Sequence, residues 1–256
     1  MINSATEKEL LYLSALVGMD NCWGIEDPFS EYSKTEIMNT MRQLREDLLQ
    51  KGCIHYNEND SLFLNENWKN LLTHCKDSKN IFVLESTKME EAGTELRYFV
   101  DGETVIRYQL NDTAQFAYTT SSLMRTEILS FFGEARKNQS QASYDVSAAT
   151  MRRMGSLSTQ RFREELLDSH CEESLASLIM NGLQGNPEFQ ALLAYVREKG
   201  MELIKGRLVV LHPLEGSLLI TSGKEYDSLS FRELNDTDLK EGLSQLLGQR
   251  NEVSVV

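Results

Sequence analysis

Proline is scarce in this sequence, with three residues among 256, and cysteine occurs four times. So few prolines leave little room for long unstructured linkers, and an apolar content of 41% with 25% charged residues is that of an ordinary globular protein. The cysteines form no CxxC pair, which favours reduced buried thiols over a disulfide framework. These features predict a folded protein of the cytosol.

Basic charge is also in deficit, because 26 lysines and arginines face 39 aspartates and glutamates, for a net charge of −13. Such a chain repels phosphate backbones and anionic lipid surfaces, which disfavours nucleic acid and membranes as partners. The apolar stretch 10–19 is too short to span a bilayer and has no basic segment before it. We therefore expect no signal peptide, no membrane anchor and a cytoplasmic location.

Motifs of common enzyme chemistry are missing from the sequence: it contains no GxGxxG, P-loop, GxSxG, HExxH or zinc-ribbon spacing. Two His-Cys dipeptides, at residues 74–75 and 170–171, are the only arrangement that suggests a metal site or a cysteine nucleophile. Each lies at a predicted helix end, where histidine can bond the last carbonyls and cysteine can pack as a small apolar group. We expect no catalytic residue, no cofactor and no metal.

The N-terminal segment has the strongest helix signals. Thr6 and Ser33 each begin a capping box with a glutamate three residues later, and the apolar stripe of the second helix ends at Gly52. Strands at 53–56 and 61–64 then predict a hairpin. A helix followed by a hairpin makes residues 6–65 similar to a winged helix.

A β-rich segment follows, in which two strands, 94–100 and 104–110, meet at the turn residues Asp101 and Gly102. One face of this hairpin is expected to carry Leu96, Tyr98, Val105 and Arg107, and the other Arg97, Phe99, Ile106 and Tyr108. Further strands at 81–85 and 115–119, a helix at 66–75 and a helix at 123–132 ending at Gly133 are also predicted.

The second half begins after residues 134–156, whose polar composition is typical of a linker. Three helices are predicted next: one at 162–168, one at 172–183, and one opened by Asn186 and Pro187 with the apolar stripe Phe189, Leu192, Leu193 and Val196. Strands at 207–211, 217–221 and 226–231 and a helix at 237–247 ending at Gly248 complete the half.

The spacing of the turns indicates an internal duplication. The turn at Glu215 and Gly216 follows the turn at Asp101 by 114 residues, and Gly248 follows Gly133 by 115. We therefore predict an α+β fold with a pseudo-twofold duplication, in which each half is a mainly antiparallel meander with flanking helices. The halves, 1–133 (sheet and helix at 79–133) and 157–248, are expected to merge into one compact domain, and 249–256 to form a disordered tail.

Five residues are candidates for partner contacts. Residues 88–93, with Met89 and Glu90, are interpreted either as a loop that reaches a partner or as a plain solvated connection between two strands. Arg97, Phe99 and Arg107 lie in strands that mix aromatic and arginine residues, a composition typical of interface cores.

This order of parts resembles the EspG family, the cytosolic chaperones of type VII secretion systems. The resemblance covers residues 6–247 and is carried by 44–64, by 96–110 and by the second copy at 208–247. It implies a chaperone that binds the tip of a helical secreted client, keeps it soluble and delivers it to the secretion machinery. Such a client would be PE/PPE-like, WXG100-like or LXG-like, and the chaperone itself a monomer or weak homodimer.

The alternative interpretation is a winged-helix transcriptional regulator or a protein–protein adaptor. Arg42, Arg45 and Lys51 could face phosphate, but Glu36, Glu46 and Asp47 lie on the same predicted helix. The field of this helix is therefore not basic, which favours a role in protein contact.

Overall fold

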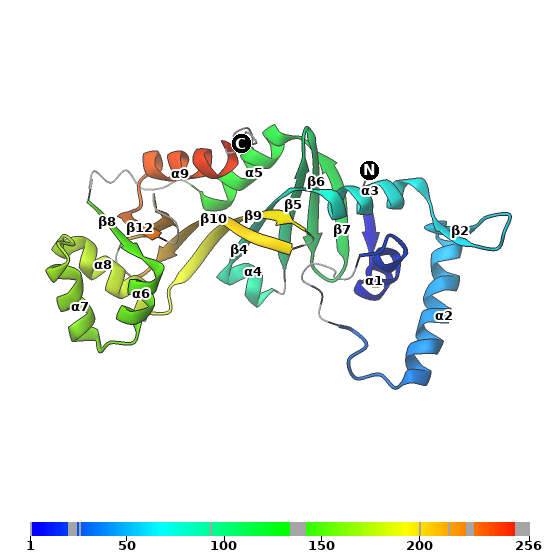
Figure 1. Ribbon diagram of the computed structural model, residues 1–256, viewed down its shortest axis with the longest axis horizontal. Helices are drawn as coiled ribbons and strands as arrows, with labels where there is room; N and C mark the ends of the chain where they lie inside the picture. Colours follow the sequence, from blue (N-terminus) through cyan, green and yellow to red (C-terminus); the bar gives the residue numbers. More distant parts are fainter. Residues whose placement is uncertain are drawn as a thin grey trace. The chain divides into compact units, whose positions relative to one another are not determined.

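The computed structural model describes residues 2–19, 25, 27–92, 94–133, 142–199, 201–214, 216–223 and 228–248 (Figure 1). The chain divides into two compact units, one formed by 1–81 and 91–124 and the other by 82–90 and 125–256. Both units combine antiparallel strands with flanking helices. The fold class is therefore α+β, as the sequence predicts.

In the first unit, four strands are neighbours in the order β1-β7-β6-β5. The elements of this unit are β1 (Ile2–Ala5), α1 (Glu7–Leu16), α2 (Lys34–Gln50), β2 (Ile54–Tyr56), β3 (Leu62–Leu64), α3 (Glu66–Asp77), β5 (Glu95–Asp101), β6 (Thr104–Leu110) and β7 (Ala114–Thr119). The chain passes between the two units within β4 (Asn80–Ser86), α4 (Thr87–Glu91) and α5 (Ser121–Phe132).

The β5–β6 hairpin turns one residue later than predicted, at Gly102 and Glu103, because Asp101 still pairs with Thr104. Gly102 has a φ of 55°, a left-handed conformation that glycine adopts without steric cost. The two faces of the hairpin carry the predicted residues, since the register pairs Tyr98 with Arg107 and Arg97 with Tyr108.

Aromatic side chains fill the core of the first unit. Tyr98, Tyr108 and Phe116 are fully buried in its sheet. Trp68 of α3 lies edge-on to Phe116, with 5.8 Å between the ring centroids. This contact places α3 against the sheet, so Tyr108 and Phe116 belong to the interior.

The N-terminal segment has the predicted order of a helix followed by a hairpin. Both capping boxes form, at Thr6 with Glu9 and at Ser33 with Glu36. Gly52 ends the α2 region with a φ of 68°, and β2 pairs with β3 directly afterwards. Leu44 and Leu48 are the fully buried residues of α2, so its first half is largely exposed.

A buried carboxylate joins the start of α1 to the end of α2. The side chain of Glu9 is 7% exposed. It accepts a hydrogen bond from the Thr6 backbone N–H and forms an ion pair with Lys51 Nζ at 2.6 Å. Burial raises the pKa of Glu9, but the bonds from Lys51 and Thr6 outweigh burial and leave it below the ordinary 4.5. The same pair raises the pKa of Lys51.

Replacing Glu9 with glutamine should lower the free energy of unfolding by about 1 kcal/mol at pH 7, because a buried ion pair is lost while the cap is retained. The pKa of Glu9 in the folded chain lies below its unfolded value. The charged carboxylate therefore stabilises the fold above pH 4.5, and this stabilisation is lost as the pH falls through the folded pKa. Urea unfolding at pH 7 and pH 3.5 measures both effects. Glu7→Gln, which removes an exposed charge from the same helix turn, should change stability little; an equal loss in both variants would contradict the assignment.

The second unit contains the strand order β9-β10-β11-β12-β8. Its elements are β8 (Ser143–Ser147), α6 (Ala148–Gly155), α7 (Thr159–Asp168), α8 (Glu173–Gln184), β9 (Glu188–Glu198), β10 (Met201–His212), β11 (Leu218–Ser222), β12 (Ser228–Glu233) and α9 (Asp236–Gly248). The predicted strand start at 226 and the predicted tail 249–256 lie outside the described residues.

The structure corrects two predictions in this unit. The third predicted helix, after Pro187, is strand β9, which pairs with β10 from Glu188 to Glu198. Its apolar residues fit both a helix and a strand that is buried on both faces, and the pairing with β10 shows that the segment is a strand. Within the predicted linker 134–156, residues 143–155 form β8, paired with β12, and helix α6.

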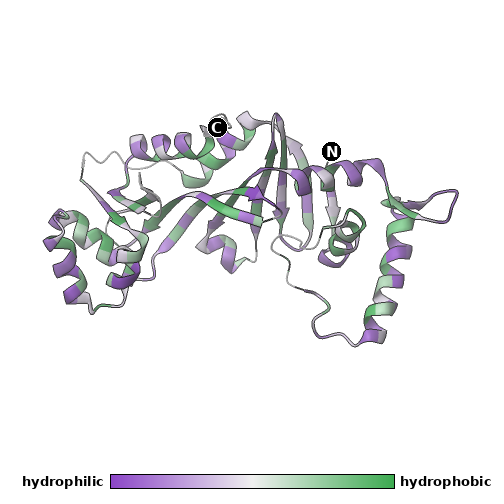
Figure 2. Ribbon diagram, viewed as in Figure 1, coloured by the Kyte–Doolittle hydropathy of each residue, from purple (hydrophilic) through white to green (hydrophobic). Residues whose placement is uncertain are grey.

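Helices cover both faces of this second sheet (Figure 1). A side chain on Gly182 of α8 would meet Leu211 and Leu218, whereas one on Gly242 of α9 would meet Leu208. Because Leu208 and Leu211 point to opposite faces of β10, α8 and α9 lie on opposite sides. Figure 2 shows the hydrophobic residues of α8 and the mainly hydrophilic surface of α7.

The core between the sheet and the three helices α6–α8 is continuous. It contains the buried side chains of Tyr144, Val146, Met154, Phe162, Leu166, Leu175, Ile179, Leu218, Ile220 and Phe231. Helix α8 supplies the largest share, since Leu175, Ala176, Leu178, Ile179 and Met180 are all buried. The two ends of α8 are where this core opens to solvent.

Candidate partner-binding groove

The His-Cys dipeptides have structural roles. His74 lies in the last turn of α3 with its Nδ1 2.7 Å from the Asn70 carbonyl, and Cys75 is fully buried. Cys171 is also buried, and desolvation raises the pKa of its thiol to about 11, which makes it a poor nucleophile. Over the described part of the chain, no three metal-ligating side chains converge.

The predicted contact residues of the β5–β6 hairpin do not form one surface. Phe99 is completely buried and packs edge-on against Tyr108, so it belongs to the core. Arg97 shares the face of Phe99 and forms an ion pair with Glu95. Arg107 points to the opposite face of the hairpin. At Phe99 the mixed composition therefore coincides with a covered strand face, whereas Arg97 and Arg107 are partly exposed.

Met89 and Glu90 lie on the short helix α4, where a loop was predicted. The Met89 backbone N–H donates to Ser86 Oγ at 3.2 Å, so the end of β4 caps the start of this turn. Glu90 is exposed and Met89 is partly buried. Both belong to the second unit, whereas Arg97, Phe99 and Arg107 belong to the first.

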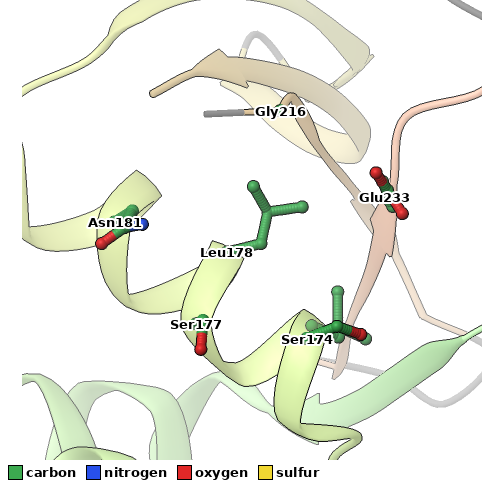
Figure 3. Close-up of a pocket in the computed structure, with 7 residues that line it drawn as sticks. Ser174, Ser177, Leu178, Asn181, Gly216 and Glu233 are labelled. Carbon is green, nitrogen blue, oxygen red and sulfur yellow. The ribbon is translucent and has the colours of Figure 1, made fainter. Parts of the chain in front are cut away.

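Two cavities open beside α8, one towards each end of the helix. The first has a volume of about 230 Å³ and is lined by Ser174, Leu175, Ser177, Leu178, Asn181, Gly216 and Glu233 (Figure 3). The Ser174 hydroxyl already donates to Glu172, and the Ser177 hydroxyl donates to the Glu173 carbonyl. The serine hydroxyls already form hydrogen bonds within the chain, and the Glu233 carboxylate lies beside them. This lining is poorly suited to an apolar partner.

The second cavity, at the C-terminal end of α8, is larger, with a volume of about 520 Å³. We call it the α6–α8 groove and define it by the residues that line it: Ala148, Met151, Arg152, Gly155, Phe162, Leu183, Gln184, Arg207 and Leu229. Its volume lies in the range of ligand-binding clefts, and most of its lining is apolar. Leu183 remains 42% exposed at its rim.

The sequence of α6 explains one wall of the groove. Ser147 caps the helix by accepting a hydrogen bond from the Thr150 backbone N–H at 3.0 Å. Met151 and Gly155 lie three and seven residues after Ala148, on one face of the helix. A Cβ built on Gly155 would meet no atom within 4 Å, so the missing side chain leaves open space in this wall.

Two arginines give the groove a positive charge. Arg152 lies on α6, with its Nε donating to the Ala148 carbonyl at 3.3 Å. Arg207 lies on β10, on the face that also presents Val209 and Leu211 to the helices. Among the described residues, no carboxylate lines the groove, whereas Glu233 lines the other cavity. The two ends of α8 therefore differ in charge as well as in size.

The groove was missed at the level of sequence because half of its wall lies in the predicted linker. The signal that could have revealed it is Ser147 followed by an apolar stripe at Ala148, Met151 and Met154, which is a short capped helix. In the sequence, Arg152 and Arg153 form only a short basic cluster. Nothing local connects them with Arg207, which is more than fifty residues away along the chain.

Comparison with known proteins gives a match at the level of fold. No protein-family model and no curated protein matches the chain. Among solved structures, the type VII secretion system chaperone EspG5 of Mycobacterium tuberculosis, in complex with a PE25-PPE41 dimer, superposes with a TM-score of 0.62. The sequences are 12% identical, and the match covers 96% of each chain. The chain therefore has an EspG-like fold.

A second solved structure, a putative adenylate cyclase from Bacillus halodurans, is 10% identical over 73% of this chain and 84% of the other. Its TM-score is 0.16. Of the helices in the described ranges, none is long and apolar enough to cross a bilayer.

Proposed function

We propose that this chain is a cytoplasmic chaperone of a type VII secretion system, which binds a helical secreted client without catalysis. The observation that carries the proposal is the fold match with EspG5 over 96% of both chains. A match of this extent includes both units and not a single common motif. Because fold alone does not assign function, the α6–α8 groove supplies the second argument.

The groove suits the masking of an apolar helix tip. Its apolar lining can desolvate client side chains, while the arginines at its rim influence which partner binds and how fast. A net charge of −13 keeps such a carrier soluble while the groove is empty. Met89, Glu90, Arg97 and Arg107 remain proposed additional contacts, whereas buried Phe99 would act through packing.

The proposed client is a PE/PPE-like helical protein, because EspG5 was captured with such a dimer. WXG100-like and LXG-like helical proteins are the alternatives of the same general shape. A helical tip would place apolar side chains three and four residues apart along the groove.

We also propose that the two halves, 1–133 and 157–248, descend from one duplicated unit. The meander β5-β6-β7 followed by α5 has its counterpart in β10-β11-β12 followed by α9. Each meander is completed by an earlier strand paired with its third strand, β1 with β7 and β8 with β12, and a helix follows each of these strands. Since β8 and α6 correspond to β1 and α1, the second copy would begin inside the segment predicted as linker.

The charges of the winged-helix-like segment disfavour the regulator alternative. Lys34, Arg42 and Arg45 on α2 are balanced by Glu36, Glu46 and Asp47. The hairpin tip carries Glu58 and Asp60, where a DNA-binding wing would carry basic residues. Retention on a DNA column in moderate salt would nevertheless favour the regulator.

Co-expression tests the proposed function directly. The full chain would be produced together with small helical secreted proteins encoded beside its gene, and the mixture separated by size-exclusion chromatography. We expect a stable complex of one chaperone with one client or one client dimer. If every helical neighbour elutes separately from a folded chaperone, the proposed function is wrong.

A further inference from the structure

Arg207 stands out because of its place in the groove. It lies on β10 immediately after Gly206, and its backbone N–H donates to Ser222 Oγ at 3.0 Å, which holds the strand at this point. Its side chain is partly exposed in the apolar groove. The helices and strands around it are packed, so the backbone position of Arg207 is set by the fold and not by a loop.

Acidic residues are abundant in this chain, and several other arginines pair with them. Other arginines form ion pairs: Arg153 with Glu165, Arg163 with Glu173, Arg197 with Glu202 and Arg232 with Asp238. Within the ranges that the structure describes, Arg207 takes part in no ion pair, and none of the lining residues of the groove is acidic. The groove is therefore a positive, apolar site in a protein with a net charge of −13.

We propose that the client segment bound in the α6–α8 groove carries an aspartate or glutamate beside its apolar anchor, and that Arg207 binds this carboxylate. The inference rests on the proposed function, because it names the chemistry of the client. A guanidinium fork matches a carboxylate in two parallel hydrogen bonds, and apolar walls around it strengthen that contact. Arg152 of α6 also lines the groove and carries a second positive charge.

The open rim of the groove favours a polypeptide over a small carboxylate such as a fatty acid. Leu183 is 42% exposed at the rim. Helix α6 lines the groove along more than one turn, and α8 adds Leu183 and Gln184 at its end, so an elongated partner can lie along α6. A fatty acid would instead need walls that enclose its chain. The experiment below includes the fatty acid as a competitor.

The probe is a displayed library of 18-residue peptides with apolar residues at helical spacing and all other positions randomised. It would be selected against the full-length chain and, in parallel, against Arg207→Gln and the matched control Arg161→Gln, an exposed arginine on α7 outside the groove. We expect the native chain and Arg161→Gln to enrich peptides with an acidic residue next to an apolar anchor. Arg207→Gln should enrich the apolar anchor without the acidic residue.

Fluorescence anisotropy with the best peptide gives the size of the effect. Replacing its acidic residue with the corresponding amide should weaken binding to the native chain about fivefold, and should have no effect on binding to Arg207→Gln. Three results would overturn the inference. The native chain could bind the acidic peptide and its amide equally well, it could select no peptide in the groove, or it could bind oleate more tightly than any peptide. In each case a client complex obtained by co-expression would leave the proposed chaperone function standing.

Discussion

Replacing Gly155 with tryptophan is expected to prevent the chain from capturing its client while leaving it folded. The Cβ of residue 155 points into open space in the wall of the α6–α8 groove, so a large side chain there fills the site from within. Loss of a central apolar contact costs at least about 2 kcal/mol, which corresponds to roughly thirtyfold weaker binding. Blocking the whole groove should exceed this value.

The backbone should tolerate this substitution. Gly155 is the last residue of α6 and does not belong to the glycines that adopt a positive φ. Removing a glycine from a helix generally favours the helix. The variant should therefore keep its melting temperature. A loss of client binding would then come from the blocked groove and not from unfolding.

Ala149→Trp is the matched control, because residue 149 is exposed on the same helix and does not line the groove. Both variants would be tested by co-purification with the client found by co-expression and by isothermal calorimetry. The control should bind like the native chain. Unchanged binding by a folded Gly155→Trp variant would show that the client docks elsewhere.

Phe231→Ala is expected to have the largest effect on stability. Phe231 is 1% exposed at the centre of β12, where its neighbours across the strands are Ile220 and Tyr144. Truncating a buried phenylalanine costs about 3–5 kcal/mol, through lost transfer energy and the cavity that remains. Since domains are stable by about 5–15 kcal/mol, much of the stability of the second unit should be lost.

Urea unfolding followed by tryptophan fluorescence and circular dichroism measures this loss, and the two probes separate the units. Trp68 reports on the first unit, because it packs against Phe116 there. Circular dichroism should show an early transition of the second unit while Trp68 fluorescence changes later. Phe231→Leu, which keeps most of the volume, should cost less than about 1.5 kcal/mol. A loss below 1 kcal/mol for alanine would mean that this core is not close-packed.

The prediction of β9 as a helix shows where local sequence reasoning fails. Asn186 and Pro187 are a good helix start, and Phe189, Leu192, Leu193 and Val196 fit a helical stripe. The pairing of β9 with β10 decides that this segment is a strand. A prediction from neighbouring residues alone does not include this pairing. If the proposed duplication is correct, β9 corresponds to β4, because β4 precedes the first meander as β9 precedes the second.

Of the predicted contact residues Arg97, Phe99 and Arg107, Phe99 lies in the core for a related reason. Alternation along a strand correctly assigned these residues to two faces, but it does not say which face is covered. Phe99 is buried, although its sequence context is the same as that of an exposed interface strand. Burial depends on what packs above a strand, and that is decided by distant segments.

The sequence by itself determined the elements whose stabilising contacts are local: the two capping boxes, the helix α2, the β2–β3 and β5–β6 hairpins and the α+β class. It also showed which common enzyme motifs the chain lacks, because each of those motifs needs a fixed spacing of residues. Only the tertiary structure decided that 188–198 is a strand, that 143–155 belongs to the fold, and that Gly155 and Arg207 line one groove. These outcomes depend on contacts between segments far apart along the chain, whose energies exceed the small local preferences of each segment.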